Sequence, residues 1–155
     1  MKVFIIRHSR AIEENHGLID DDRYLTAEGR LRARAVGAAL AHEGVRFGAV
    51  ISSPLVRAVQ TAELVCEQVG YRGVIAISRA LVHSMPARLA AGELAKRGDN
   101  VACFGHMPHL SDLGALLTGR AGFPHFKPCQ VMVIDDGEAR WTLDPDSLRV
   151  EPIET

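Results

Sequence analysis

The chain has 155 residues, 47% of them hydrophobic, and its 18 Lys and Arg nearly balance 19 Asp and Glu. The resulting net charge of −1 argues against a nucleic-acid partner bound by bulk positive charge. No apolar run reaches the roughly 20 residues of a membrane span, so we expect no membrane partner. The length favours a single domain over residues 1–155. Three irregularly spaced cysteines and the lack of a signal sequence indicate a cytoplasmic protein without a disulfide framework.

Short apolar runs alternate with helix-like segments along the chain. We predict strands at residues 2–6, 49–52, 73–77 and 101–104, and a hairpin that pairs residues 130–134 with 139–143. We predict helices that start after the N-cap Thr26 and, with Ser53 as N-cap, at Pro54, and that run to residues 43 and 69, and two more at residues 86–97 and 108–117. Residues 15–22 are polar and are expected to form a solvated loop. The alternation predicts a three-layer α/β/α sandwich with a mostly parallel central sheet and a hairpin at one edge.

Polar side chains of one chemical kind follow three of the predicted strands. Arg7 and His8 end the first strand, Arg57 lies in the first turn of the helix after the second, and His106 follows the fourth. Ligands of open α/β sheets bind beyond the carboxyl ends of the strands, so we expect these side chains to converge. Guanidinium groups and a nearby helix N-terminus suit an oxyanion such as phosphate.

Each of these residues also has an ordinary interpretation. Arg7 alone is typical of a surface ion pair and Arg57 of a solvated helix residue, while His8 and His106 are each typical of a core histidine bonded to the backbone. Their joint placement at strand ends favours the oxyanion site instead. We further expect Arg57 to face the solvent within that site.

Four sequence motifs resemble those of the histidine phosphatase superfamily, which has the phosphoglycerate-mutase-like fold. They are R-H at residues 7–8, L-T-x-x-G at residues 25–29, S-S-P-L-x-R-A-x-Q-T-A at residues 52–62 and G-H-x-P at residues 105–108. They occur in the family's order and span most of the chain up to about residue 118. The short length, without room for a large cap, is most similar to the SixA-type phosphohistidine phosphatases.

The resemblance implies that His8 is a nucleophile that forms a phosphohistidine intermediate. It makes Arg7, Arg57 and His106 the catalytic phosphate pocket. Ser9 stands where the family normally has glycine, and its hydroxyl either adds a donor to the phosphate or is merely tolerated. Adjacent strand residues point to opposite faces, so the chain must leave the strand near Arg7 if both side chains are to reach one pocket.

Many family members place a carboxylic acid between the motifs that correspond to residues 52–62 and 105–108 here, where it protonates the leaving oxygen. Residues 78–88 contain no carboxylate, and His83 is the only possible acid there. An alkoxide leaving group depends on such a proton more than a phosphoramidate does. The lack of a carboxylic acid in residues 78–88 therefore favours protein phosphohistidine as the substrate. A site that no large cap covers also suits a protein partner.

Two further readings remain open: a small-molecule phosphomonoesterase that acts on a small phosphorylated substrate, and a non-catalytic phosphate-binding domain. We expect no metal and no cofactor, because His106 and His109 lack partners at metal-ligand spacing. His109 is a candidate for the rim of the pocket. The run of three aspartates at residues 20–22 is expected to be solvated, and Cys129 is expected to be more exposed than the other two cysteines.

Overall fold

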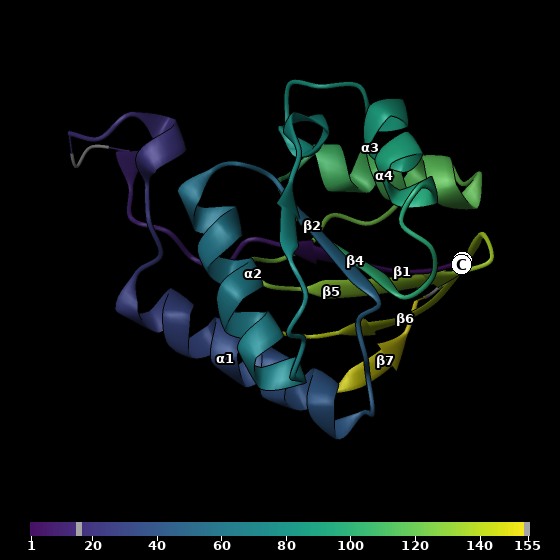
Figure 1. The fold of residues 1–155 in the computed structure, drawn as a ribbon, viewed down its shortest axis with the longest axis horizontal. Coiled ribbons are helices and arrows are strands. Elements are labelled where there is room, and N and C mark those ends of the chain that lie inside the picture. Colours follow the sequence, from purple (N-terminus) through teal and green to yellow (C-terminus); the bar gives the residue numbers. More distant parts are fainter. Residues whose placement is uncertain (15–16, 154–155) are drawn as a thin grey trace.

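A seven-stranded sheet crosses the centre of the molecule, with helices on both of its faces (Figure 1). The computed structural model describes residues 1–14 and 17–153. In the order β3-β2-β4-β1-β5-β6-β7, the strands are β3 (Ile75–Ile77), β2 (Ala49–Ser52), β4 (Val101–Gly105), β1 (Lys2–Arg7), β5 (Val131–Asp135), β6 (Glu138–Leu143) and β7 (Val150–Pro152).

Two pairs of helices cover the sheet and give the predicted three layers. α1 (Ala27–His42) and α2 (Val56–Val69) pack on one face, while α3 (Ala87–Ala95) and α4 (His109–Thr118) pack on the other (Figure 1). Successive β1 residues serve opposite cores: Phe4 and Ile6 face α1 and α2, whereas Val3 and Ile5 face α3 and α4. Across the described ranges 1–14 and 17–153, no helix is long and apolar enough to cross a membrane.

The sheet is parallel in only one half, which corrects the expectation of a mostly parallel sheet. The neighbouring pairs are parallel from β3 through β2 and β4 to β1. The remaining pairs, β1 with β5, β5 with β6 and β6 with β7, are antiparallel. The loop between α4 and β5 carries the chain back to the edge where β1 ends, since the Cys129 N–H bonds the Arg7 carbonyl there, so β5 runs opposite to β1. The unpredicted β7 is a short, exposed edge strand that ends in proline, a composition with little strand signal.

Most predicted element boundaries agree with the structure to within about two residues, but α2 begins later than expected. Its first residue is Val56 because the hydroxyl of Ser53 accepts the Leu55 N–H at 3.2 Å and closes a turn before the helix. Arg57 nevertheless lies in the first helical turn. Thr26 caps α1 as predicted by accepting the Gly29 N–H at 2.9 Å.

Two loop expectations also change. Of the predicted loop at 15–22, residues 15 and 16 lie outside the described residues, and residues 20–22 form a short 3₁₀ turn, η2 (Asp20–Asp22). A second 3₁₀ turn, η3 (Arg79–Leu81), precedes α3. Cys129 is fully buried rather than exposed, and burial raises the pKa of its thiol to about 12.

The start of α1 lies against the loop that follows β1, and this close approach explains the glycine of the L-T-x-x-G motif. A Cβ atom at Gly29 would lie 2.1 Å from the carbonyl oxygen of Arg10, much closer than any van der Waals contact. Thr26 also donates its backbone N–H to that oxygen at 3.0 Å. Only glycine lets α1 hold the loop beside His8 in this position.

Gly29→Ala is therefore expected to destabilise the protein by about 1–3 kcal/mol, because either the helix or the loop must shift to admit the methyl group. Urea unfolding measures the change. The matched control is Gly92→Ala in the middle of α3, where nothing lies within 4 Å of the added Cβ and helix propensity should give about 0.5–1 kcal/mol of stabilisation. Equal free energies of unfolding for the two variants would contradict the argument.

Candidate active site

The predicted site residues converge at the carboxyl ends of three neighbouring strands. His8 follows β1, His106 follows β4 and Ser53 follows β2, with β4 between the other two. Backbone hydrogen bonds keep the ends level: the His8 N–H donates to Gly105 and the Ser53 N–H to Phe104, both at 3.0 Å. The rings of His8 and His106 are 5.2 Å apart between centroids.

One ring nitrogen of His8 is held by the backbone. Its Nδ1 lies 2.6 Å from the carbonyl oxygen of Ser9. A carbonyl can only accept a hydrogen bond, so Nδ1 carries the ring proton and Nε2 keeps its lone pair. Burial above all, together with the nearby charges of Arg57 and Arg7, lowers the pKa of His8 to about 4, although the hydrogen bond to Ser9 opposes the shift. At neutral pH the ring is therefore an uncharged base with a free lone pair, as a nucleophile requires.

His106 is buried and bonded through its other nitrogen. Its Nε2 lies 2.7 Å from the Ser53 hydroxyl, which already accepts the Leu55 N–H and can donate its own proton to the ring. In that tautomer Nδ1 carries the proton, and this buried atom has no partner among the described residues. Burial, with His8 nearby, lowers the pKa of His106 to about 2. His106 can thus offer a neutral N–H to an anion.

Arg7 ends β1 and lies on the α3 and α4 side of the sheet. Its Nη1 donates to the carbonyl oxygen of Phe126 at 2.8 Å, and burial lowers the pKa of its guanidinium group. No acidic side chain within residues 1–14 and 17–153 forms an ion pair with it. Its Nε is buried without a hydrogen-bond partner in the same part of the chain.

Arg57 is only 4% exposed, so the expectation of a solvent-facing arginine is wrong. Its Nη1 donates to the backbone carbonyl of Asp20 at 2.8 Å and its Nη2 lies 3.2 Å from the Asp20 carboxylate. Arg23 holds the same carboxylate through Nε and Nη2, at 2.9 and 2.8 Å. The expectation that all three aspartates are merely solvated is therefore wrong for Asp20.

Three buried nitrogen atoms of this site have no partner among the described residues: Nε of Arg7, Nε of Arg57 and Nδ1 of His106. A buried donor without an acceptor costs about 1–3 kcal/mol, and more if it is charged. A tetrahedral oxyanion bound between these side chains would offer acceptors to nitrogen atoms that lack them and would bring negative charge to Arg7, which has no acidic partner among the described residues. The arrangement can therefore bind phosphate with side chains alone and present it to His8.

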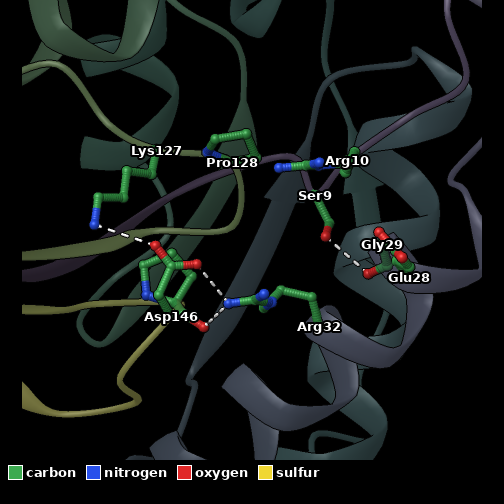
Figure 2. Close-up of a pocket in the computed structure, with 9 residues that line it drawn as sticks. Ser9, Arg10, Glu28, Gly29, Arg32, Lys127, Pro128 and Asp146 are labelled. Atoms are coloured by element: carbon green, nitrogen blue, oxygen red, sulfur yellow. Dashed lines mark hydrogen bonds and ion pairs between the residues drawn. The ribbon is translucent and has the colours of Figure 1, made fainter.

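The hydroxyl of Ser9 points away from this site, which corrects the suggestion that it binds phosphate. It donates its only proton to the Gly29 carbonyl at 2.7 Å, at the wall of a separate pocket of about 260 Å³ (Figure 2). The Ser9 N–H donates to Thr61 at 2.9 Å. Arg10, Arg32 and Lys127 also line that pocket. Ser9 thus fastens the loop after β1 to α1 and α2.

The remaining histidines take different positions. His83 is exposed, and its ring is edge-on to that of His106 with 6.1 Å between centroids. His109 is 1% exposed, so it lies inside the fold and not at a pocket rim. Burial lowers the pKa of His109, although Asp112 opposes the shift. Within the residues that the structure describes, no three His, Cys, Asp or Glu side chains are grouped so that they could hold a metal ion.

Comparison with known proteins gives a consistent family. The model of the histidine phosphatase superfamily (branch 1) matches residues 3–81. A Picosynechococcus protein without an assigned function is 30% identical over 152 residues, which cover 95% of this chain and 92% of that protein. The mitochondrial serine/threonine-protein phosphatase Pgam5 of Drosophila virilis is 36% identical over 69 residues. That match covers 44% of this chain but only 23% of Pgam5, so the chain spans about a quarter of that relative.

A solved structure resembles the whole fold. The protein histidine phosphatase SixA, in complex with tungstate, has a TM-score of 0.87 and 25% identity, and the match covers 96% of this chain and all of SixA. The chain therefore belongs to the histidine phosphatase superfamily. Within that superfamily its structure is similar to SixA.

The low pKa of His8 predicts how stability depends on pH. The unfolded chain binds a proton at His8 near pH 6.5, whereas the folded protein binds it only near pH 4. The His8 contribution to stability is thus complete above about pH 6.5 and is lost as the pH falls through about 4. In urea unfolding over that range, wild type should lose more stability than His8→Asn. If wild type and His8→Asn lost stability equally over this pH range, His8 would have the same pKa in the folded and unfolded states.

Proposed function

We propose that this protein hydrolyses phosphohistidine on a protein substrate, with His8 as the nucleophile. The single observation that carries the proposal is the state of His8: an uncharged ring, fixed by its Nδ1–H bond to Ser9, beside Arg7 and Arg57, whose Nε–H groups have no partner in the part of the chain that the structure describes. Tungstate is a tetrahedral oxyanion, so the SixA complex supports a phosphate-binding site on this fold.

The reaction proceeds in two displacements at phosphorus. In the first, the Nε2 lone pair of His8 forms a bond to phosphorus while the bond to the leaving group breaks and its electron pair departs with that group. In the second, a water oxygen attacks phosphorus, the His8 bond breaks and returns its pair to Nε2, and one water proton passes to phosphate or solvent. Arg7, Arg57 and His106 donate to the equatorial oxygens, whose charge they stabilise in both transition states.

The leaving group decides between substrates. No carboxylate stands in residues 78–88, the stretch where many related phosphatases place the acid. The N-phosphorylated ring of phosphohistidine can leave as neutral imidazole once its other nitrogen is protonated, so it needs no enzyme acid. This favours a phosphoramidate over an alkyl phosphate.

The His8 assignment is tested by incubation with phosphoramidate, quenching within milliseconds in alkaline denaturant and analysis for base-stable, acid-labile phosphate. Wild type should carry the label and His8→Ala should lose it entirely, because no other side chain replaces the nucleophile. The matched control is His42→Ala, which removes an exposed histidine at the end of α1 and should keep the label. Label that persists in a folded His8→Ala variant would overturn the assignment.

The leaving-group argument is tested by comparing kcat/KM for a phosphohistidine peptide with that for the same peptide carrying phosphoserine. We expect the phosphohistidine peptide to be favoured by about 100-fold or more, since an alkoxide without a proton donor loses about 10²–10⁴-fold in rate. Comparable values would instead support the phosphomonoesterase alternative, for which the nearby exposed ring of His83 is the candidate acid. In that case His83→Gln should slow only the phosphoserine peptide.

A further inference from the structure

The Asp20 carboxylate stands at the entrance of the site. Its side chain is 41% exposed, whereas that of Arg57, which it contacts, is 5% exposed. Asp20 therefore lies between the buried guanidinium group and the solvent. It comes from η2, a segment far in sequence from the motif that supplies Arg57.

Two arginines hold this carboxylate in place. Arg57 donates to both its backbone and its side chain, and Arg23 binds the other carboxylate oxygen while donating Nη1 to the Ile12 carbonyl at 2.8 Å. Partial burial raises the pKa of Asp20, but the hydrogen bonds from Arg23 and the charge of Arg57 outweigh it and lower the pKa below its usual value. Asp20 is thus a permanent negative charge at this position and cannot serve as a proton donor.

The position of Asp20 relative to the reaction follows from in-line displacement. His8 is half-buried at the end of β1 and attacks from the side of the sheet, so the leaving group departs on the opposite side of phosphorus. That side is the entrance, because a leaving group that belongs to another protein must remain outside. Asp20 and the departing ring therefore occupy the same region.

We propose that Asp20 recognises the protonated imidazole ring of the substrate phosphohistidine, by accepting a hydrogen bond from the ring nitrogen that is not bonded to phosphorus. This inference rests on the proposed function. A carboxylate there favours the cationic, N-phosphorylated ring, which is the form whose N–P bond breaks most readily. When that bond breaks, its electron pair stays on the departing nitrogen, the positive charge disappears and neutral imidazole leaves with its other N–H intact. Asp20 neither gains nor loses a proton.

The same charge disfavours other leaving groups. A phenolate or alkoxide develops negative charge as it departs, and a fixed carboxylate at the entrance repels it. Asp20 thus acts as a specificity determinant that lets a protonated ring leave and opposes an anionic oxygen. A residue that only held Arg57 in place would instead affect all substrates alike, and this difference makes the proposal testable.

The experiment compares wild type, Asp20→Asn and the matched control Asp21→Asn on a phosphohistidine peptide and on p-nitrophenyl phosphate. Asp21 is exposed, and no ion pair of its carboxylate is found among the described residues, so its variant removes the same charge one position away. Asp20→Asn should lower kcat/KM for phosphohistidine by about 10–100-fold, the usual strength of a hydrogen bond to a charged group. The value for p-nitrophenyl phosphate should stay unchanged or rise, and Asp21→Asn should match wild type on both.

Inhibition by inorganic phosphate shows whether Arg57 keeps its position in Asp20→Asn, and the inhibition constant should stay within about threefold of wild type. Parallel losses on both substrates would mean that Asp20 only positions Arg57 and would overturn the proposal, as would no loss on phosphohistidine. The wild type tests the proposed function separately. If it forms no label at His8 or does not hydrolyse the phosphohistidine peptide, the proposed function fails whatever the Asp20 variant does.

Discussion

The hydrogen bond from His8 Nδ1–H to the Ser9 carbonyl is the interaction on which the chemistry of this site depends. It fixes the tautomer of the ring and leaves the Nε2 lone pair available, at a pH where an exposed histidine would be partly protonated. The carbonyl can do this only because Ser9 is itself immobile: Thr61 accepts its N–H and Gly29 accepts its hydroxyl proton. Ser9, which stands where the family usually has glycine, therefore supports the His8 ring indirectly, by holding the carbonyl group to which the ring is bonded.

The sequence motifs predicted that His8 lies among cationic groups but could not predict the hydrogen-bond partners of each group. The fold class and the convergence of His8, Arg57 and His106 followed from strands that end in polar residues, a local signal that needs no knowledge of packing. The contact of Asp20 with Arg57 joins residues 37 positions apart, and Asp20 lies in a loop without hydrophobic periodicity. No sequence pattern therefore predicted this contact. The burial of Arg57 escaped prediction for the same reason, since η2 covers it.

The charge of the guanidinium group and the number of its donors explain why the site is built from arginine. Two guanidinium groups lie close to His8, and both depress the pKa of its ring, so a neutral imidazole lies beside two cations. Each arginine donates through a terminal nitrogen to a backbone carbonyl, that of Phe126 or of Asp20, while its Nε has no partner within residues 1–14 and 17–153. The planar guanidinium group spreads its donors over three nitrogen atoms, so one can be anchored to the protein while another faces the phosphate, whereas the three donors of lysine all share one nitrogen.

The antiparallel half of the sheet, which is larger than the hairpin that the sequence predicted, also builds the site. Because β5 runs opposite to β1, the loop that leads into β5 arrives at the edge where β1 ends. In that loop, the Phe126 carbonyl accepts a hydrogen bond from the Arg7 guanidinium group. The Cys129 N–H donates to the carbonyl oxygens of Arg7 and His8, at 3.1 Å each. A fifth parallel strand would begin at the far edge and leave these groups unpaired. The parallel half thus delivers the reacting side chains, and the antiparallel half holds the backbone that carries them.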